Sequence, residues 1–218
     1  MRTEVLATEH GNIVRLFADT KKELTLTFFR VQEYYESQKP ELFRKSFSVM
    51  EFLEAMMTDD GVIEYFSDWD GFNVPDELFN RWISEQSLGG FTKQENALID
   101  SLLDLDRKTP YYVIGAMKGD KGTLEHEMSH AYYYLNPEYI AEANNLLHIF
   151  ETTYPDEYKQ FVHDLKELGY ADDVIDDETV AWMAATNKRE FNDTFYVEYA
   201  KLEPLIKRFR KLLRKYNK

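Results

Sequence analysis

Residues 126–130 read His-Glu-Met-Ser-His, and this H-E-x-x-H spacing has a chemical meaning on an α-helix. A helix turns once in 3.6 residues, so His126 and His130 project from the same face. Two imidazoles one turn apart can share a tetrahedral zinc ion, and Glu127 can then accept a proton from a water at that ion. Core histidines that only satisfy hydrogen bonds are the alternative. Because the chain has only five histidines, a chance match is uncommon, and we expect a metal site.

The flanking residues support a helix at this position. Residues 111–117 form an apolar, aromatic and β-branched run, which predicts a strand. Residues 118–122 contain two glycines and an aspartate and predict a turn. We expect Thr123 or the preceding glycine to cap the helix. The helix should end near Asn136, because Pro137 disfavours helical geometry in the residue before it.

A strand, a tight turn and an H-E-x-x-H helix together resemble the zincin metallopeptidases, over about thirty residues of the chain. Within that group the metzincins require Gly and His where this chain has Tyr133 and Asn136. Peptide deformylases use a cysteine, and this chain contains none. The remaining likeness is to the gluzincins, in which a glutamate from a later helix completes the zinc site. The chain lacks the N-E-x-x-S-D signature that usually surrounds that glutamate.

Glu178 is the candidate for this third ligand. Its spacing from Ala181 and Ala185 places it on the same face of a predicted helix, and that face is otherwise apolar and expected to be buried. A buried carboxylate is costly unless it is paired or bound to metal. Asp177 is the second choice. Asp176, Asp177 and Glu178 also suit the first turn of an ordinary helix, where acidic residues complement the helix dipole.

The resemblance implies a zinc-dependent peptidase, with Glu127 as general base and later as proton donor to the leaving amine. The oxyanion of the transition state needs a further donor. Tyr170 is our candidate for that donor, ahead of Tyr196 and Arg189. The strand before the helix could offer its edge to an extended peptide or protein substrate.

Two other functions remain open at this stage. The chain could be a zincin-like fold that binds metal without catalysis, as a metal-binding or interaction protein. It could also be a metal-free acidic module that binds a basic partner. Loss of activity with zinc retained in Glu127→Gln would separate the enzyme from the first alternative.

The composition is that of a folded, acidic protein. Hydrophobic residues make up 44% and aromatic residues 15%, which excludes disorder despite a net charge of -14. No apolar run is long enough to span a membrane, and the first residues do not begin a signal peptide. The absence of cysteine agrees with the cytoplasmic location that we expect.

The basic residues concentrate at the C-terminus. Residues 201–218 contain eight Lys or Arg and one acid, which leaves a net charge of -21 in residues 1–200. An amphipathic helix is predicted after Pro204, with its apolar stripe formed by Ile206, Phe209, Leu213 and Tyr216. We expect this helix to pack on the acidic body of the same chain. A membrane surface or nucleic acid is the disfavoured alternative, because the acidic body would repel a polyanion.

The fold class that these patterns predict is α+β: a helix-rich, zincin-like domain with a small sheet beside the H-E-x-x-H helix. Residues 1–88 are expected to form a mixed α/β part and residues 89–218 a mainly helical part, unless both form one compact domain. The joint is placed at Leu88-Gly89-Gly90. Residues 24–35 are strand-prone, although a helix from Phe28 fits too. Further helices are expected at 46–57, 75–86, 92–105, 137–150, 156–168 and 173–185.

Overall fold

The computed structural model describes residues 1–86, 90–106 and 108–217. Contacts between residues divide the chain into two compact units, Met1–Asp120 and Lys121–Lys218. The division therefore follows Asp120, whereas the sequence suggested a joint at residues 88–90. Leu88 and Gly89 themselves lie outside the described residues. The predicted α+β class is confirmed, since helices dominate and the strands of the described residues form a single sheet.

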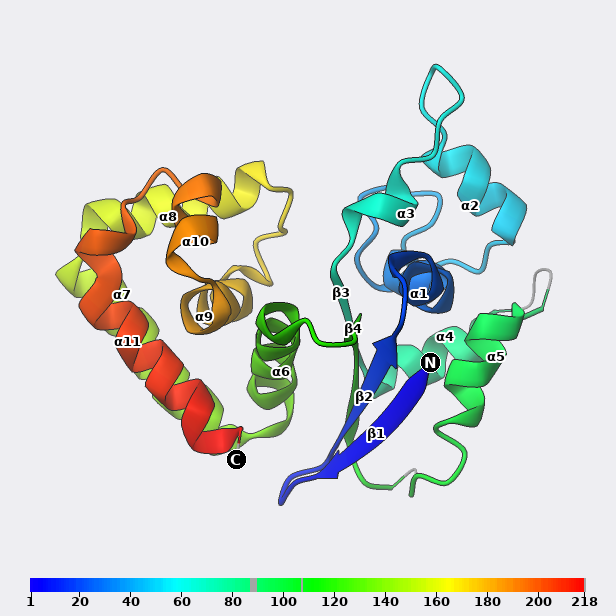
Figure 1. Cartoon of the computed structure of the whole chain (residues 1–218), viewed down its shortest axis with the longest axis horizontal. Helices are drawn as coiled ribbons and strands as arrows, with labels where there is room; N and C mark the ends of the chain where they lie inside the picture. Colours follow the sequence, from blue (N-terminus) through cyan, green and yellow to red (C-terminus); the bar gives the residue numbers. More distant parts are fainter. Residues whose placement is uncertain (87–89, 107, 218) are drawn as a thin grey trace. The chain divides into compact units, whose positions relative to one another are not determined.

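The sheet belongs to the first unit and is mixed (Figure 1). Its strands are β1 (Arg2–Ala7), β2 (Asn12–Ala18), β3 (Gly71–Pro75) and β4 (Tyr111–Met117), in the order β1-β2-β4-β3. β1 and β2 form an antiparallel hairpin, β4 runs parallel to β2, and β3 runs antiparallel to β4. The parallel pair joins segments almost a hundred residues apart, which is why β4 belongs to the same unit as the N-terminal strands.

The expectation that the 111–117 strand offers a free edge to a substrate is wrong. β2 pairs with β4 along its whole length, from Asn12–Tyr111 to Ala18–Met117. β3 pairs with the opposite edge, from Pro75–Tyr112 to Gly71–Ala116. With both edges hydrogen-bonded, β4 has no backbone groups left for an added strand.

The helices of the first unit include a long one where the sequence favoured a strand. They are α1 (Lys21–Glu36), α2 (Val49–Met56), α3 (Tyr65–Asp68), α4 (Asp76–Glu85) and α5 (Lys93–Asp100). The Thr20 side chain caps α1 by accepting a hydrogen bond from the Glu23 amide. Leu24, Phe28 and Val31 join the unit's core at helical spacing, so the burial pattern overrides the β-propensity of the run.

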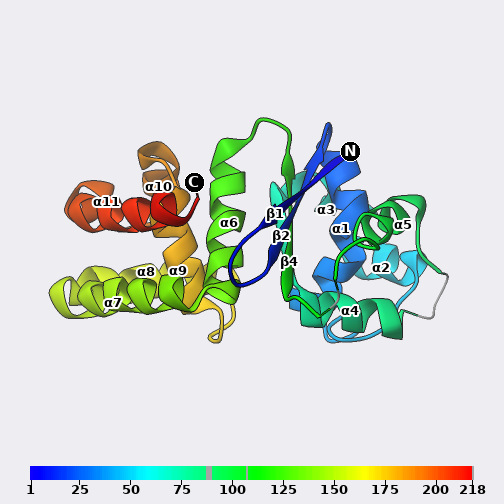
Figure 2. The same cartoon turned by 90° about the horizontal axis from the view of Figure 1, so that it is seen from below.

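The helix α1 lies on one face of the sheet, and α4 and α5 are on the same side (Figure 2). Phe28 of α1 stacks on Phe72 of β3 with ring centroids 5.2 Å apart. Phe28 also covers Gly115 of β4, where a side chain would overlap its ring. The absence of a Cβ at residue 115 therefore sets how closely α1 approaches the sheet.

A buried ion pair connects α1 to α5 within this unit. Arg30 and Glu95 both have side chains that are 0% exposed. The Arg30 Nε atom donates to Glu95 Oε1 at 2.7 Å, and its Nη atoms donate to Glu95 Oε2 and to the carbonyls of Phe47 and Gly90. Glu95 also completes the predicted capping box with Thr92. Because the charges are paired and hydrogen-bonded, the two groups can be buried together.

The second unit is built from helices (Figure 1). In its described residues these are α6 (Lys121–Leu135), α7 (Pro137–Thr153), α8 (Pro155–Glu167), α9 (Ile175–Ala185), α10 (Lys188–Thr194) and α11 (Tyr199–Tyr216). α6 begins two residues before Thr123, so Thr123 is not its cap. α6 ends before Asn136 as predicted, and the Asn136 side chain caps α7.

The basic helix α11 begins at Tyr199, so Pro204 lies inside the helix instead of preceding it. The earlier start buries Tyr199 and Leu202. α11 packs against α7 and α9, and Lys215 forms an ion pair with Glu142 of α7. Among the described residues, no helix has the length and apolar character needed to cross a bilayer.

Candidate metal centre

The helix α6 carries the two histidines of the candidate site. His126 and His130 are one turn apart, and their ring centroids are separated by 4.9 Å with an interplanar angle of 72°. The His130 side chain is only 2% exposed, whereas that of His126 is 18% exposed. Glu127, between them, is also buried. The site is therefore open to solvent on the side of His126 and closed around His130.

The helix α9 supplies the acidic partner, as the helical spacing predicted. α6 and α9 pack against each other within the second unit. Glu178 Oε1 lies 3.5 Å from His130 Nε2, and Glu178 Oε2 lies 3.6 Å from His126 Nε2. Ala181, one turn after Glu178, is fully buried and leaves room for a close helix approach. One ligand atom from each of the three side chains falls within 4.8 Å of the others.

Asp177 holds His130 from its other side. Its Oδ2 atom lies 2.9 Å from His130 Nδ1, at hydrogen-bond distance. When Nδ1 carries the proton and donates it to this carboxylate, Nε2 is left as a lone pair directed toward Glu178. A carboxylate on the second ring nitrogen is a common partner of metal-binding histidines, because it fixes the tautomer and the ring orientation.

The charges around His130 favour a cation at the site. Burial alone would lower the pKa of His130, but the carboxylates of Asp177, Glu178 and Glu127 together raise this pKa well above its ordinary value. Burial alone would raise the pKa of Glu178, but His130, His126 and Tyr170 together lower it. Three carboxylates gathered around two histidines thus form a negative site that a positive charge stabilises.

Several polar atoms at the centre have no hydrogen-bond partner in the described part of the chain. These buried atoms are His130 Nε2 and Glu178 Oε2, with Asp177 Oδ1 beside them. An unsatisfied buried polar atom costs about 1–3 kcal/mol, so such groups call for a partner. His130 Nε2 and Glu178 Oε2 face the same small region, as their distances to the neighbouring ligand atoms show.

These residues fit a zinc ion. Two imidazoles and one carboxylate are a known donor set for zinc. Two ligand atoms at about 2.1 Å from an ion and at the tetrahedral angle are about 3.4 Å apart. The 3.5 and 3.6 Å separations between Glu178 and the histidines are close to that value. His126, His130 and Glu178 are therefore the residues that would hold the metal.

Tyr170, the predicted oxyanion donor, lies at this site in the loop between α8 and α9. Its side chain is close enough to Glu178 to help lower the pKa of that carboxyl group. The preceding Gly169 has a φ of 99°, a conformation that favours glycine, and it ends α8. The Gly169 amide donates to Lys166 O and the Tyr170 amide to Leu165 O, the two hydrogen bonds of a Schellman motif. This turn fixes the backbone from which Tyr170 reaches Glu178.

Trp182 is a contact that the motif did not predict. Its ring packs edge-on against His126, with centroids 5.4 Å apart and an interplanar angle of 80°. Trp182 lies one turn after Glu178, so the same face of α9 contacts both the ring and the ligand atoms of the candidate site. Phe195 also packs edge-on against the indole, with ring centroids 5.1 Å apart. These aromatic contacts hold the more exposed histidine in place.

The weaker candidates are placed differently. Tyr196 is 89% exposed, and its amide donates to Asp164. Arg189 is exposed and pairs with Asp193 on its own helix. Among the described residues, neither forms a hydrogen bond, ion pair or ring contact with the two histidines or Glu178.

Comparisons with family models, with curated proteins and with solved structures found no match to this chain. The chemistry of the site therefore rests on the residues themselves.

Proposed function

We propose that the protein is a zinc-dependent peptidase whose metal ligands are His126, His130 and Glu178. The observation that supports this most directly is the convergence of these side chains on one buried region, with ligand atoms within 4.8 Å of one another and His130 Nε2 and Glu178 Oε2 unpaired. The order of residues agrees with the gluzincin resemblance, in which the glutamate follows the histidine pair on a later helix.

The residues of the site would divide the chemistry between them. Zinc, when bound, supplies a Lewis acid that polarises a carbonyl and lowers the pKa of water toward neutrality. Glu127 then accepts the proton of the attacking water and passes it to the leaving amine. Asp177 keeps the proton of His130 on Nδ1, so that Nε2 stays available as a ligand.

Tyr170 has a second part in this proposal. Its side chain influences the pKa of Glu178, so it lies beside a proposed ligand without being one of the three. A phenol next to the proposed ligands can donate a hydrogen bond to an oxyanion that develops beside them. Tyr170→Phe is then expected to lower kcat by about ten-fold to a hundred-fold while zinc remains bound.

The decisive experiment compares three single variants of the whole chain, purified without a histidine tag. We expect one zinc per chain by elemental analysis in the wild type. Glu127→Gln should keep the zinc but lose at least about a hundred-fold in the hydrolysis of a quenched-fluorescent peptide library. Glu178→Ala should lose the zinc. Glu125→Gln, the same charge change one residue from His126 on the same helix, is the matched control and should behave as wild type.

Each result separates the proposal from its alternatives. Zinc in the wild type without any peptide hydrolysis would leave a non-catalytic metal-binding or interaction protein. Hydrolysis that survives Glu127→Gln unchanged would show that this carboxylate is not the base. A wild-type chain that takes up no zinc, even with excess metal, would overturn the site.

A further inference from the structure

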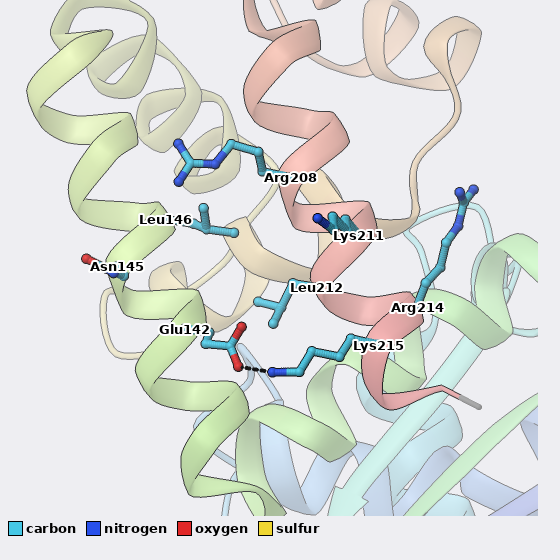
Figure 3. Close-up of a pocket in the computed structure, with 8 residues that line it drawn as sticks. All are labelled: Glu142, Asn145, Leu146, Arg208, Lys211, Leu212, Arg214 and Lys215. Carbon is cyan, nitrogen blue, oxygen red and sulfur yellow. Dashed lines mark hydrogen bonds and ion pairs between the residues drawn. The ribbon is translucent and has the colours of Figure 1, made fainter.

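A second feature of the helical unit is a groove between α7 and α11, separate from the candidate metal ligands (Figure 3). It has a volume of about 600 Å³, within the range of sites that bind small molecules. α7 contributes Glu142, Asn145 and Leu146, and α11 contributes Leu212 and four basic residues. We call it the α7–α11 groove.

The cations of the groove come from one stripe of α11. Arg208, Lys211 and Lys215 are spaced three and four residues apart, so they follow one face of the helix over about 10 Å. Arg214 lines the groove beside them. In the described part of the chain, Arg208, Lys211 and Arg214 form no ion pair and no hydrogen bond. Their charges are therefore available to an external anion.

The other lining residues give the groove an apolar base and an uneven distribution of charge along its length. Leu146 and Leu212 face each other between the helices and are 7% and 5% exposed, which leaves a small apolar surface at the base. Glu142 forms its ion pair with Lys215 at 2.5 Å, as Figure 3 shows. The charge of Lys215 is therefore offset by Glu142. Arg208, Lys211 and Arg214 supply the positive charge that is not offset, and Arg208 lies farthest from the Glu142–Lys215 pair.

The chemistry of the groove selects against large polyanions. The chain has a net charge of -14, which would repel a nucleic acid or an anionic membrane extending beyond the groove. The two leucines are too buried to insert into a lipid layer. A short segment avoids the repulsion, because charges beyond a Debye length of about 8 Å are screened. An apolar floor also favours a peptide side chain over a bare phosphate.

We propose that the α7–α11 groove binds a short acidic peptide segment of a partner protein. Carboxylates of the segment pair with Arg208 and Lys211, and an apolar side chain rests on Leu146 and Leu212. Lys215, at the opposite end, already pairs with Glu142 and is not needed for this recognition. This binding site does not depend on the metal centre, so it stands whether or not the protein is a peptidase.

The experiment measures fluorescence anisotropy of a labelled peptide of about twelve residues, in which two glutamates one turn apart flank a leucine. We expect saturable binding to the full chain that weakens as NaCl rises from about 50 to about 300 mM. The double variant Arg208→Gln/Lys211→Gln should bind at least about ten-fold more weakly, through the loss of two charge-assisted contacts. Glutamine in place of the peptide glutamates should have a similar effect.

The matched control is Lys159→Gln/Lys188→Gln, which makes the same change in net charge at exposed lysines of the same unit. It should leave the peptide affinity within about two-fold of wild type. A circular-dichroism melt checks that both double variants are folded. Equal losses in the two double variants would overturn the proposal, because the effect would then be one of net charge alone.

Other occupants give distinct results, and each would also overturn the proposal. Tripolyphosphate that displaces the labelled peptide and binds more tightly would point to a phosphate ligand. Sedimentation with phosphatidylserine vesicles that is lost in Arg208→Gln/Lys211→Gln would point to a membrane. A doubled mass in light scattering that is lost in the same variant would point to a second copy of this chain. Saturable peptide binding with none of these results would support the acidic segment.

Discussion

Asp177 and Glu178 are consecutive residues, yet α9 directs their carboxylates to different nitrogens of the same histidine. Asp177 contacts His130 Nδ1, and Glu178 contacts His130 Nε2 and His126 Nε2. Consecutive residues of a helix point in directions about 100° apart, so the two carboxylates lie on opposite sides of the His130 ring. The two positions therefore predict different phenotypes.

Asp177→Ala should weaken zinc binding by about ten-fold to a hundred-fold while one ion still binds at saturation, because the carboxylate positions His130 without ligating. Glu178→Ala should abolish stoichiometric binding. Competition with a chromophoric zinc chelator measures both affinities. Asp176→Ala, an exposed acid in the same turn, serves as control. If Asp177→Ala loses the ion and Glu178→Ala retains it, Asp177 is the ligand.

Glu33 predicts an unusual dependence of stability on pH. Burial raises the pKa of Glu33, and the neighbouring Ser37, Tyr65 and Lys39 oppose this rise without cancelling it. A carboxyl group with a raised folded pKa destabilises the fold as pH rises above its unfolded pKa of about 4.3, and the loss is complete above the folded pKa. Below both values the group costs nothing.

Glu33→Gln should therefore increase the free energy of unfolding at neutral pH by about 1 kcal/mol and have little effect near pH 4. Urea unfolding at the two pH values measures the difference. Glu54→Gln, at an exposed position of α2, is the control and should show no such dependence. A gain that is the same at both pH values would mean that titration of Glu33 is not its cause.

At this scale, part of the candidate site could be predicted and part could not. His126, Glu127 and His130 are close in sequence, so helical geometry alone brings them together. Glu178 is distant, but its place on an apolar face of a later helix made it a candidate. The contact of Asp177 with His130 Nδ1 depends on how α6 and α9 pack, and no sequence spacing encodes that.

Among the elements, β4 shows how a neighbouring helix restricts a strand. Gly115 faces Phe28 of α1, and a Cβ built there would lie 2.8 Å from Phe28 Cζ and still nearer to Cε2. Real side chains do not approach so closely, so an added methyl group must move the ring or the helix. Overpacking of this kind in a core costs about 1–3 kcal/mol.

Gly115→Ala should accordingly lower the free energy of unfolding by about 2 kcal/mol, as measured by chemical denaturation. Phe28→Leu in the same chain should recover part of the loss, since it removes the atoms that overlap. Gly61→Ala is a comparison of another kind, because a Cβ there meets no atom within 4 Å but the backbone has a φ of 81°. If the double variant is no more stable than Gly115→Ala, the overlap is not the cause.

Helices and strands could be predicted where the hydrophobic periodicity agreed with the capping and turn residues at their ends. Pro137, the Thr92 capping box and the turn after β4 placed the end of α6, the start of α5 and the end of β4 close to their observed positions, whereas α5 ends at Asp100 and not at the predicted residue 105. The α1 run was ambiguous because its aromatic and β-branched residues favour strand while their spacing favours helix. The partners of β4 could not be deduced, since pairing with β2 joins residues about a hundred positions apart.

At the scale of the whole molecule, every candidate metal ligand comes from one of the two units. His126, His130 and Glu178 all follow Asp120, where the first unit ends. The sequence suggested a boundary near residue 88, because glycines often mark linkers. The observed boundary is later, since β4 is required to complete a sheet that begins with residues 2–18.

A fragment of residues 121–218 should therefore fold and bind one zinc by itself, with the same dependence on Glu178 as the full chain. Its size is sufficient for a core of its own. Cooperative thermal unfolding with and without zinc tests the fold, and elemental analysis tests the metal. An unfolded fragment would show that the first unit is needed for the stability of the second. A folded fragment without zinc would contradict the ligand assignment.

The contact between Trp182 and His126 allows the candidate site to be followed by tryptophan fluorescence. The chain has three tryptophans, and Trp182 is the one in the second unit. Its indole lies 5.4 Å from the ring of His126, so emission from this residue reports on what that imidazole binds. Titration with a paramagnetic ion such as Co²⁺ should quench it by short-range transfer, whereas Zn²⁺ should shift it without quenching. The protein thus carries a built-in fluorophore that reports on the proposed metal site.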